Sequence, residues 1–267
     1  MPSLRVLNHA FRAWRRNRTW AKHEPETPYL ADLLSGAPVC LHVGASDGRH
    51  SYVMTQVAPK ARIYAFEPSA FAFAVLKVGI AWNRMGKQVT AIHAAVADKP
   101  GELLLVTPKK TSGRMGRAYA YVAETMPNGQ ARPDLDDTGM ETQPTAVITL
   151  DGFCTEHGID RVDFIRMDIE GAEQRALQGA AAILDRDHPH VLLEIHPPML
   201  QARFGGSGEA VMNLFLHRGY RMFALDAGRL EERTTLVEDL PWKDYFFIHP
   251  SRAARLPDGV FKARMAG

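Results

Sequence analysis

Two groups of small and acidic residues could bind a ligand, because each follows an apolar run typical of a buried strand. The first, residues 44–48, comes directly after the run Val39–Val43. The second, residues 168–173, comes directly after Phe164–Met167. Open α/β sheets bind their ligands at the carboxyl ends of the parallel strands. The two groups therefore predict one site, approached from two strands.

The first group has the composition of a ligand-binding turn and consists of Gly44, Ala45, Ser46, Asp47 and Gly48. Gly44 permits a tight turn, and Gly48 allows a helix to begin close to the strand. Backbone N–H groups between the two glycines could face a carboxylate or a phosphate.

Glu67 ends the next apolar run, about 20 positions after Gly48. An acid at this distance from a glycine turn binds the ribose hydroxyls in nucleotide-binding folds. The dinucleotide pattern G-x-G-x-x-G is not met, because Ser46 and Asp47 stand inside the turn. The turn therefore favours S-adenosylmethionine over a dinucleotide.

Four residues with acid–base chemistry follow the fourth and fifth apolar runs: Asp168, Glu170, Glu194 and His196. A hydroxyl that accepts a methyl group must lose its proton, and His196 titrates in the range that suits a general base. The three carboxylates could instead order the acceptor or bind Mg²⁺, which prefers oxygen ligands. A further alternative is that Glu170 and Glu173 cap the helix that follows.

The elements that must position these residues alternate between strands and helices, which predicts a doubly wound, mostly parallel sheet. Helices are expected near 51–57, 71–85, 173–184 and 209–218. The segments 220–225 and 245–248 are expected to pair as a closing antiparallel hairpin. Residues 107–145 lack a regular pattern and predict a long loop, either a lid or a passive connection.

Composition narrows the class of protein further. The chain of 267 residues has a net charge of only +2, which argues against nucleic acid as a partner. No segment is apolar enough to span a membrane. The two cysteines, Cys40 and Cys154, have no metal-like spacing and indicate a reducing, cytoplasmic setting.

Residues 1–28 predict a separate basic amphipathic helix ahead of a domain over residues 29–267. Leu4, Leu7, Phe11 and Trp14 recur at helical spacing, with arginines on the other side. We expect this apolar stripe to dock on the domain. The alternative is a helix that contacts a membrane surface or a partner.

Five short motifs together resemble the FkbM family of S-adenosylmethionine-dependent methyltransferases. They are Gly-Ala-Ser-Asp-Gly at 44–48, Phe-Glu-Pro at 66–68, Thr-Leu-Asp at 149–151, Asp-Ile-Glu-Gly-Ala-Glu at 168–173 and Leu-Glu-Ile at 193–195. The resemblance covers roughly residues 38–250. It implies the seven-stranded class I methyltransferase fold and O-methylation of a hydroxyl on a sugar, glycan or secondary metabolite.

The same resemblance assigns binding roles to residues near the first strands. Residues 44–48 would hold the methionine part of the cofactor, Glu67 the ribose, and Ala95 with Val96 the adenine edge. One departure is His42, which stands where the family usually has an acid two residues before the first glycine.

Two other functions remain open at this stage. One is a nucleotide-dependent oxidoreductase, which the sequence of the turn disfavours. The other is a non-catalytic scaffold that binds the cofactor and is recruited through its N-terminal helix.

Overall fold

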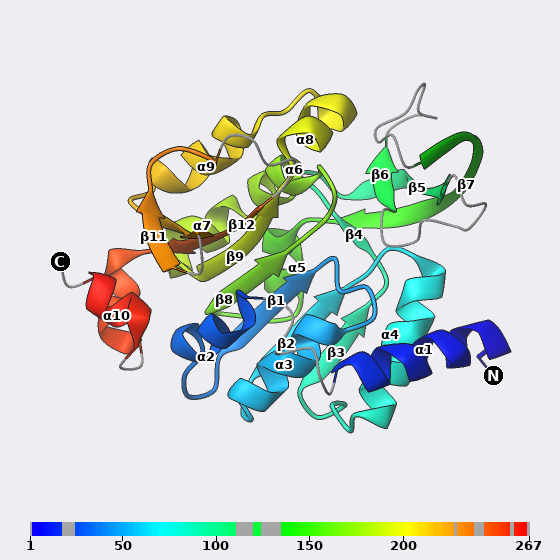
Figure 1. The fold of residues 1–267 in the computed structure, drawn as a ribbon, viewed down its shortest axis with the longest axis horizontal. Coiled ribbons are helices and arrows are strands. Elements are labelled where there is room, and N and C mark those ends of the chain that lie inside the picture. The colour runs from blue at the N-terminus through cyan, green and yellow to red at the C-terminus, as the bar shows by residue number, and fades with distance from the viewer. Residues whose placement is uncertain are drawn as a thin grey trace.

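A mixed eight-stranded sheet forms the centre of the molecule (Figure 1). The structure is a computed structural model that describes residues 2–17, 25–110, 120–123, 135–226, 229–237, 243–256 and 259–265. Within these residues the strand order of the main sheet is β11-β10-β12-β9-β8-β1-β2-β3.

Five parallel strands make up the core of this sheet: β1 (Val39–Val43), β2 (Arg62–Phe66), β3 (Val89–Ile92), β8 (Phe164–Met167) and β9 (His190–Ile195). They are rich in apolar residues because both faces of a parallel sheet are covered. The chain winds outward from β1 through β2 to β3 and later continues on its other side with β8. The crevice between β1 and β8 is therefore the switch point at which doubly wound sheets bind ligands.

The C-terminal strands are antiparallel, as the sequence predicted. β12 (Lys243–Ile248) inserts between β9 and β10 (Arg221–Asp226), and it pairs antiparallel with both. The sheet has one strand more than the expected seven, because β11 (Arg229–Arg233) forms a hairpin with β10 at the edge. This added strand lies at the edge far from the switch point.

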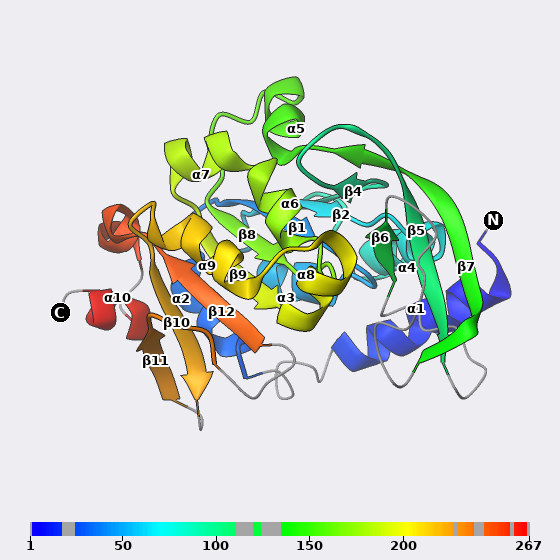
Figure 2. The ribbon, with the colours of Figure 1, turned by 90° about the horizontal axis from the view of Figure 1, so that it is seen from above.

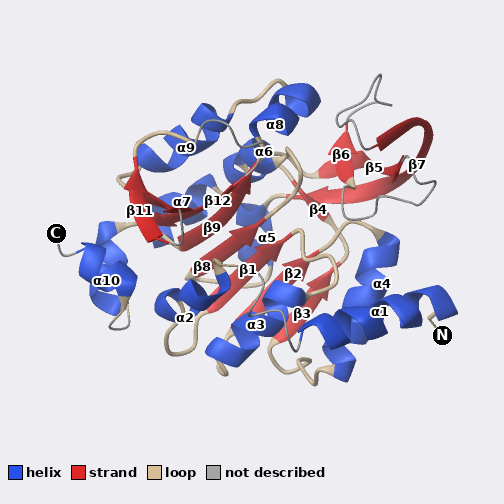
Figure 3. Ribbon diagram, in the orientation of Figure 1, coloured by secondary structure: helices blue, strands red, loops and turns tan. Residues whose placement is uncertain are grey.

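Helices cover both faces of the sheet (Figures 2 and 3). One face packs against α5 (Leu150–Glu156), α6 (Glu173–Gln178), α7 (Ala181–Asp187), α8 (Pro197–Phe204) and α9 (Gly208–Leu216). The opposite face packs against α2 (Leu30–Leu33), α3 (Arg49–Val57), α4 (Ala70–Trp82) and α10 (Val260–Met265). Two short 3-10 turns, Thr27–Tyr29 and Pro250–Arg255, precede α2 and α10. The resulting three-layer α/β structure agrees with the expected class.

The expectation of a long loop over residues 107–145 is wrong where the structure describes this segment. β5 (Gly101–Lys110), β6 (Tyr121–Ala123) and β7 (Leu135–Ile148) pair antiparallel around β5, and β4 (Ala95–Val96) adds to β7 in parallel. They form a second sheet beside the main one, at the right in Figures 1 and 2. Residues 111–119 and 124–134, the remainder of the expected loop, lie outside the described residues.

The N-terminal helix α1 (Leu4–Asn17) packs along α4, but through a different stripe from the expected one. Val6, Ala10 and Ala13 are buried, whereas Leu4 and Phe11 are exposed. Small side chains allow the two helices to approach closely. The remainder of the expected helix, residues 18–24, lies outside the described residues.

Gly44 is the residue that allows β1 and β8 to end side by side. Its φ is +79°, and a Cβ atom built there would lie 2.0 Å from the carbonyl oxygen of Asp168. Real atoms cannot approach this closely, so any side chain at position 44 must separate the two strand ends.

We expect Gly44→Ala to lower the free energy of unfolding by more than about 3 kcal/mol, because it adds a backbone clash to the strain of a positive φ. Gly36→Ala is a matched control, since Gly36 also has a positive φ of +66° but nothing lies within 4 Å of its Cβ position. It should lose only about 1–2 kcal/mol. Urea unfolding of both variants measures the difference, and equal losses would contradict the close approach described here.

Candidate active site

The main pocket of the described residues opens at the carboxyl ends of β1, β2 and β8. Its volume is about 800 Å³, including the open mouth. Of the residues that the sequence predicted for the site, seven line it: Gly44, Ser46, Glu67, Ala95, Val96, Asp168 and Glu170. The switch point of the sheet and the sequence motifs therefore indicate the same place.

Backbone N–H groups of the turn at residues 44–48 donate hydrogen bonds to other groups of the protein. The N–H groups of Gly44 and Ala45 donate to the carbonyl of Phe66, and that of Gly48 donates to the carbonyl of Ala45. Ser46, whose φ of 49° is unusual for a residue with a side chain, donates its N–H to Glu67. The turn therefore supplies shape and anchors Glu67, whereas the sequence suggested amides directed at a ligand.

Glu67 lines the pocket, and each of its carboxylate oxygens accepts a backbone hydrogen bond. Oε2 accepts the N–H of Ser46 at 2.8 Å, and Oε1 accepts the N–H of Ser69 at 2.8 Å. Burial raises its pKa to about 7 against these two hydrogen bonds, which lower it. Each oxygen retains a second lone pair, so the carboxylate can still accept a hydrogen bond from a ligand hydroxyl.

Asp47 points away from the pocket and forms an ion pair with Arg16 of α1. Asp47 is buried, while Arg16 is half exposed. The N-terminal helix is thus attached directly to the turn beside the pocket. Ala45 and Gly48 also lie outside the pocket lining; Gly48 precedes the first residue of α3.

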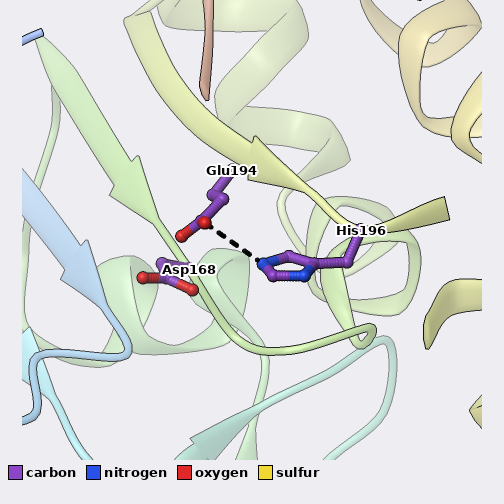
Figure 4. A group of neighbouring side chains, drawn as sticks. All are labelled: Asp168, Glu194 and His196. Carbon is purple, nitrogen blue, oxygen red and sulfur yellow. Dashed lines mark ion pairs between the residues drawn. The ribbon is translucent and has the colours of Figure 1, made fainter. Parts of the chain in front are cut away.

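The acceptor end of the site brings together Asp168, Glu194 and His196, as Figure 4 shows. One potential ligand atom from each residue lies within 4.8 Å of the others. Nε2 of His196 is 3.4 Å from Oε1 of Glu194. Of the three, only Asp168 lines the pocket, so His196 lies behind the pocket wall with Glu194.

A buried arginine that sequence reasoning missed supplies positive charge to this cluster. The guanidinium of Arg166, in β8, lies 3.7 Å from Asp168, 3.9 Å from Glu194 and 3.3 Å from Asp244. Its side chain is only 3% exposed. The sequence signal was an arginine inside an otherwise apolar strand, because a buried charge requires partners.

The single positive charge of Arg166 does not balance the three surrounding carboxylates. The pKa values of Asp168 and His196 are both raised. Burial and the charge of Glu194 raise the pKa of Asp168 to about 7, although 28% of its side chain is exposed to the pocket. Burial lowers the pKa of His196, but the hydrogen bond with Glu194 and the charge of Glu170 outweigh it and give a value of about 8. Near neutral pH the cluster therefore holds protons that it can exchange.

Glu170 and Glu173 shape the turn after β8. Glu170 has a positive φ of 56° and lines the pocket. Glu173 is completely buried, and its Oε1 accepts the N–H groups of Gly171 at 2.9 Å and Ile169 at 3.4 Å. No side-chain hydrogen bond from the N-cap Ala172 caps α6, and Glu173 instead fixes the turn that precedes the helix.

The second sheet contributes one wall of the pocket, which the sequence did not predict. Leu105 of β5 and Tyr121 and Val122 of β6 line it. β7 is joined to the end of β2 through Pro68, whose carbonyl accepts hydrogen bonds from Gln143 at 3.3 Å and Thr145 at 3.4 Å. Because the wall comes from a segment without clear periodicity, no pattern in the sequence marked it.

His42 occupies the position at which an acid was expected by resemblance. It is buried, and its Nδ1 is 2.7 Å from Oγ of Ser51. Burial, His50 and Arg166 lower its pKa well below the usual value. His42 is therefore neutral and takes no share of the Arg166 charge.

The chain matches known proteins over the region that carries this site. The model of the "Methyltransferase FkbM domain" family matches residues 42–222. Among curated relatives, the chain is 27% identical over 182 residues to "31-O-demethyl-FK506 methyltransferase FkbM" of Streptomyces tacrolimicus, a match that covers 61% of this chain and 67% of the relative. It is 28% identical over 159 residues to "2-O-methyltransferase NoeI" of Sinorhizobium fredii, over 56% of this chain and 60% of the relative. The chain thus spans about two thirds or less of these relatives.

Solved structures give weaker matches. The methyltransferase FkbM of Methylobacillus flagellatus has a TM-score of 0.47 and 14% identity, over 80% of this chain and 45% of that one. An O-methyltransferase from Bacillus cereus has a TM-score of 0.47 and 12% identity, over 92% of this chain and 91% of that one.

We expect Glu194→Gln to lower the pKa of His196 from about 8 by roughly one unit or more, since it removes a negatively charged hydrogen-bond partner of the imidazolium. An NMR titration of the imidazole measures this. Glu209→Gln removes an exposed acid of α9 and should leave that pKa unchanged. An unaltered His196 titration in Glu194→Gln would show that Glu194 does not control this proton.

Proposed function

Because this chain belongs to the FkbM methyltransferase family, we propose that it transfers a methyl group from S-adenosylmethionine to a hydroxyl of a sugar, glycan or secondary metabolite. The observation that carries the proposal is the meeting of two sets of residues in one pocket. Glu67 lies at one end of this pocket, and Asp168, backed by Glu194 and His196, lies at the other.

The residues at the Glu67 end fit S-adenosylmethionine. The buried carboxylate has free lone pairs for ribose hydroxyls, and Ala95 with Val96 forms an apolar wall suited to an adenine ring. Gly44 and Ser46 line the same side and would contact the methionine part of the cofactor. These contacts orient the cofactor, and orientation supplies much of the rate of a displacement reaction.

S-adenosylmethionine, when bound, supplies an electrophilic methyl group attached to a sulfonium. The acceptor hydroxyl must release its proton as its oxygen gains the methyl group. Asp168 is the base that faces the pocket, and its raised pKa of about 7 suits proton transfer near neutral pH. Glu194 and His196 act behind it as positioning residues that hold the carboxylate and share its proton.

Two relatives and the cluster of Asp168, Glu194 and His196 support a hydroxyl as the acceptor. One relative is named for O-methylation of a demethylated FK506, and another is named a 2-O-methyltransferase. A base adjacent to the pocket is what a hydroxyl acceptor requires, since a neutral hydroxyl is a poor nucleophile. The reaction therefore does not need the redox chemistry of the nucleotide-dependent oxidoreductase considered above.

We further propose that transfer proceeds without Mg²⁺. The spacing of Asp168, Glu194 and His196 would allow a divalent ion. Arg166, however, already places a positive charge within 3.7–3.9 Å of the two carboxylates, and an imidazole is a poor ligand for magnesium. The guanidinium takes the charge-balancing role that a metal would have.

Replacing Glu67 tests the cofactor end. We expect Glu67→Gln to weaken S-adenosylmethionine binding about tenfold to a hundredfold in calorimetry, the range for losing hydrogen bonds to a charged group. The exposed Glu156→Gln serves as a control and should bind normally. Thermal unfolding of both variants separates lost contacts from a disturbed turn. Unchanged binding in a folded Glu67→Gln would remove Glu67 from the cofactor site.

Replacing Asp168 and His196 separates the base from its support. Asp168→Asn should lower turnover about 10²–10⁴-fold while retaining cofactor binding. His196→Gln should move the acidic limb of the pH–rate profile to higher pH, because the imidazolium lowers the pKa of Asp168 and its removal raises that pKa.

The acceptor for this assay is found by incubating labelled cofactor with host extract and identifying the methylated product by mass spectrometry. Cofactor binding without any methylated product would favour the scaffold alternative, and full activity in Asp168→Asn would exclude it as the base.

A further inference from the structure

Helix α1 carries its larger apolar side chains beside its docked face, and two of them are strongly exposed. Residues 4, 7, 11 and 14 fall on one side of a helix with 3.6 residues per turn. Leu4 is 79% exposed and Phe11 is 49% exposed, while Leu7 and Trp14 are half-buried. We call these four residues the outer strip. Only four large apolar side chains are strongly exposed in the part of the chain that the structure describes, and two of them are Leu4 and Phe11.

The inner face of α1 is already satisfied without the outer strip. Val6, Ala10 and Ala13 are buried, and the first two pack in one cluster with Val75 of α4. His9 adds an edge contact with the ring of Phe71 at 5.5 Å. Leu4 and Phe11 therefore remain exposed although the helix is docked. Within it, the rings of Phe11 and Trp14 stack at 6.0 Å, which forms a continuous apolar and aromatic surface.

A basic strip lies beside the outer strip. Arg5, Arg12 and Arg15 are exposed on α1, and no acidic residue precedes Glu24 in the sequence. The chain as a whole has a net charge of only +2. Helix α1 contains four arginines and no acid, so its own net charge exceeds that of the whole chain.

We propose that α1 binds the surface of an anionic lipid bilayer, lying in the plane of the interface while it remains docked on α4. An exposed apolar strip next to arginines is the arrangement by which interfacial helices insert shallowly and attract acidic headgroups. Arginine side chains can extend from the apolar level to the headgroups, and aromatic rings favour the same boundary. No helix in the described residues is long and apolar enough to cross a bilayer, so the contact is peripheral.

The length of α1 distinguishes a bilayer from a partner helix. The outer strip has the spacing of two heptads, because the helix has 14 residues. A coiled coil is indicated by apolar heptads sustained over about three to four repeats, which the described residues of α1 do not show. A bilayer has no such requirement, since each inserted side chain adds independently to binding.

Vesicle sedimentation with the full chain tests the proposal. The chain should bind vesicles of phosphatidylcholine with about one third phosphatidylglycerol, and bind pure phosphatidylcholine vesicles far more weakly. Binding should weaken as salt is raised, because salt screens the attraction of exposed charges. Arg5→Gln/Arg12→Gln/Arg15→Gln should lower the partition coefficient about a hundredfold, at about fivefold per arginine. Leu4→Ser/Phe11→Ser should lower it at least about tenfold.

Matched controls carry the same changes elsewhere on the surface. Lys60→Gln/Arg62→Gln/Lys87→Gln removes three exposed positive charges, and Val260→Ser removes another exposed apolar side chain. Both should bind anionic vesicles like the wild type. Binding lost equally in the controls, or absent from anionic vesicles at low salt, would overturn the proposal. A wild-type dimer that dissociates in Leu4→Ser/Phe11→Ser would also overturn it, since a second copy would then cover the outer strip.

Discussion

The candidate site depends on the contacts between the buried guanidinium of Arg166 and three carboxylates. Asp244 of β12 and Glu194 of β9 face one another directly across the antiparallel pair, an unfavourable arrangement for two like charges. Asp168 brings a third carboxylate to the same place from β8. A single arginine, contributed from within β8, lies close to all three. Breaking a buried charge pair typically costs about 3–5 kcal/mol, so loss of this side chain would leave three neighbouring carboxylates without their shared positive charge.

Burial is the main cause that lowers the pKa of His42 and keeps it neutral, and the charges of His50 and Arg166 add to it. His42 and Arg166 are directly paired in the register of β1 and β8. An acid at position 42 would compete for the guanidinium with the carboxylates of the acceptor end. The neutral imidazole instead bonds with Ser51 of α3, and the positive charge remains available on the side of β9 and β12.

Much of the main sheet could be predicted from the sequence, because β1, β2 and β8 are short apolar runs that end at unmistakable turns. Apolar runs at 95–96, 103–106 and 146–148 indicated parts of the second sheet, but its middle could not be predicted, since β7 is polar along most of its length and pairs with β5 there. The residues of the candidate site could likewise be predicted only in part. Glu67 and Asp168 follow strand ends and were found, whereas the roles of Arg166 and of the β6 wall depend on contacts between distant segments. The stripe by which α1 docks was also missed, because alanines at helical spacing give a weak hydrophobic signal.

The ion pair between Arg16 and Asp47 is a direct contact between α1 and the turn after β1. In the same turn, Ser46 donates its N–H to Glu67, which lines the pocket, so two contacts separate the surface helix from the pocket. Linkage requires that a ligand which favours the docked helix be favoured by it to the same degree. Any coupling through these two contacts would make occupancy of the pocket and docking of the helix two readings of one equilibrium.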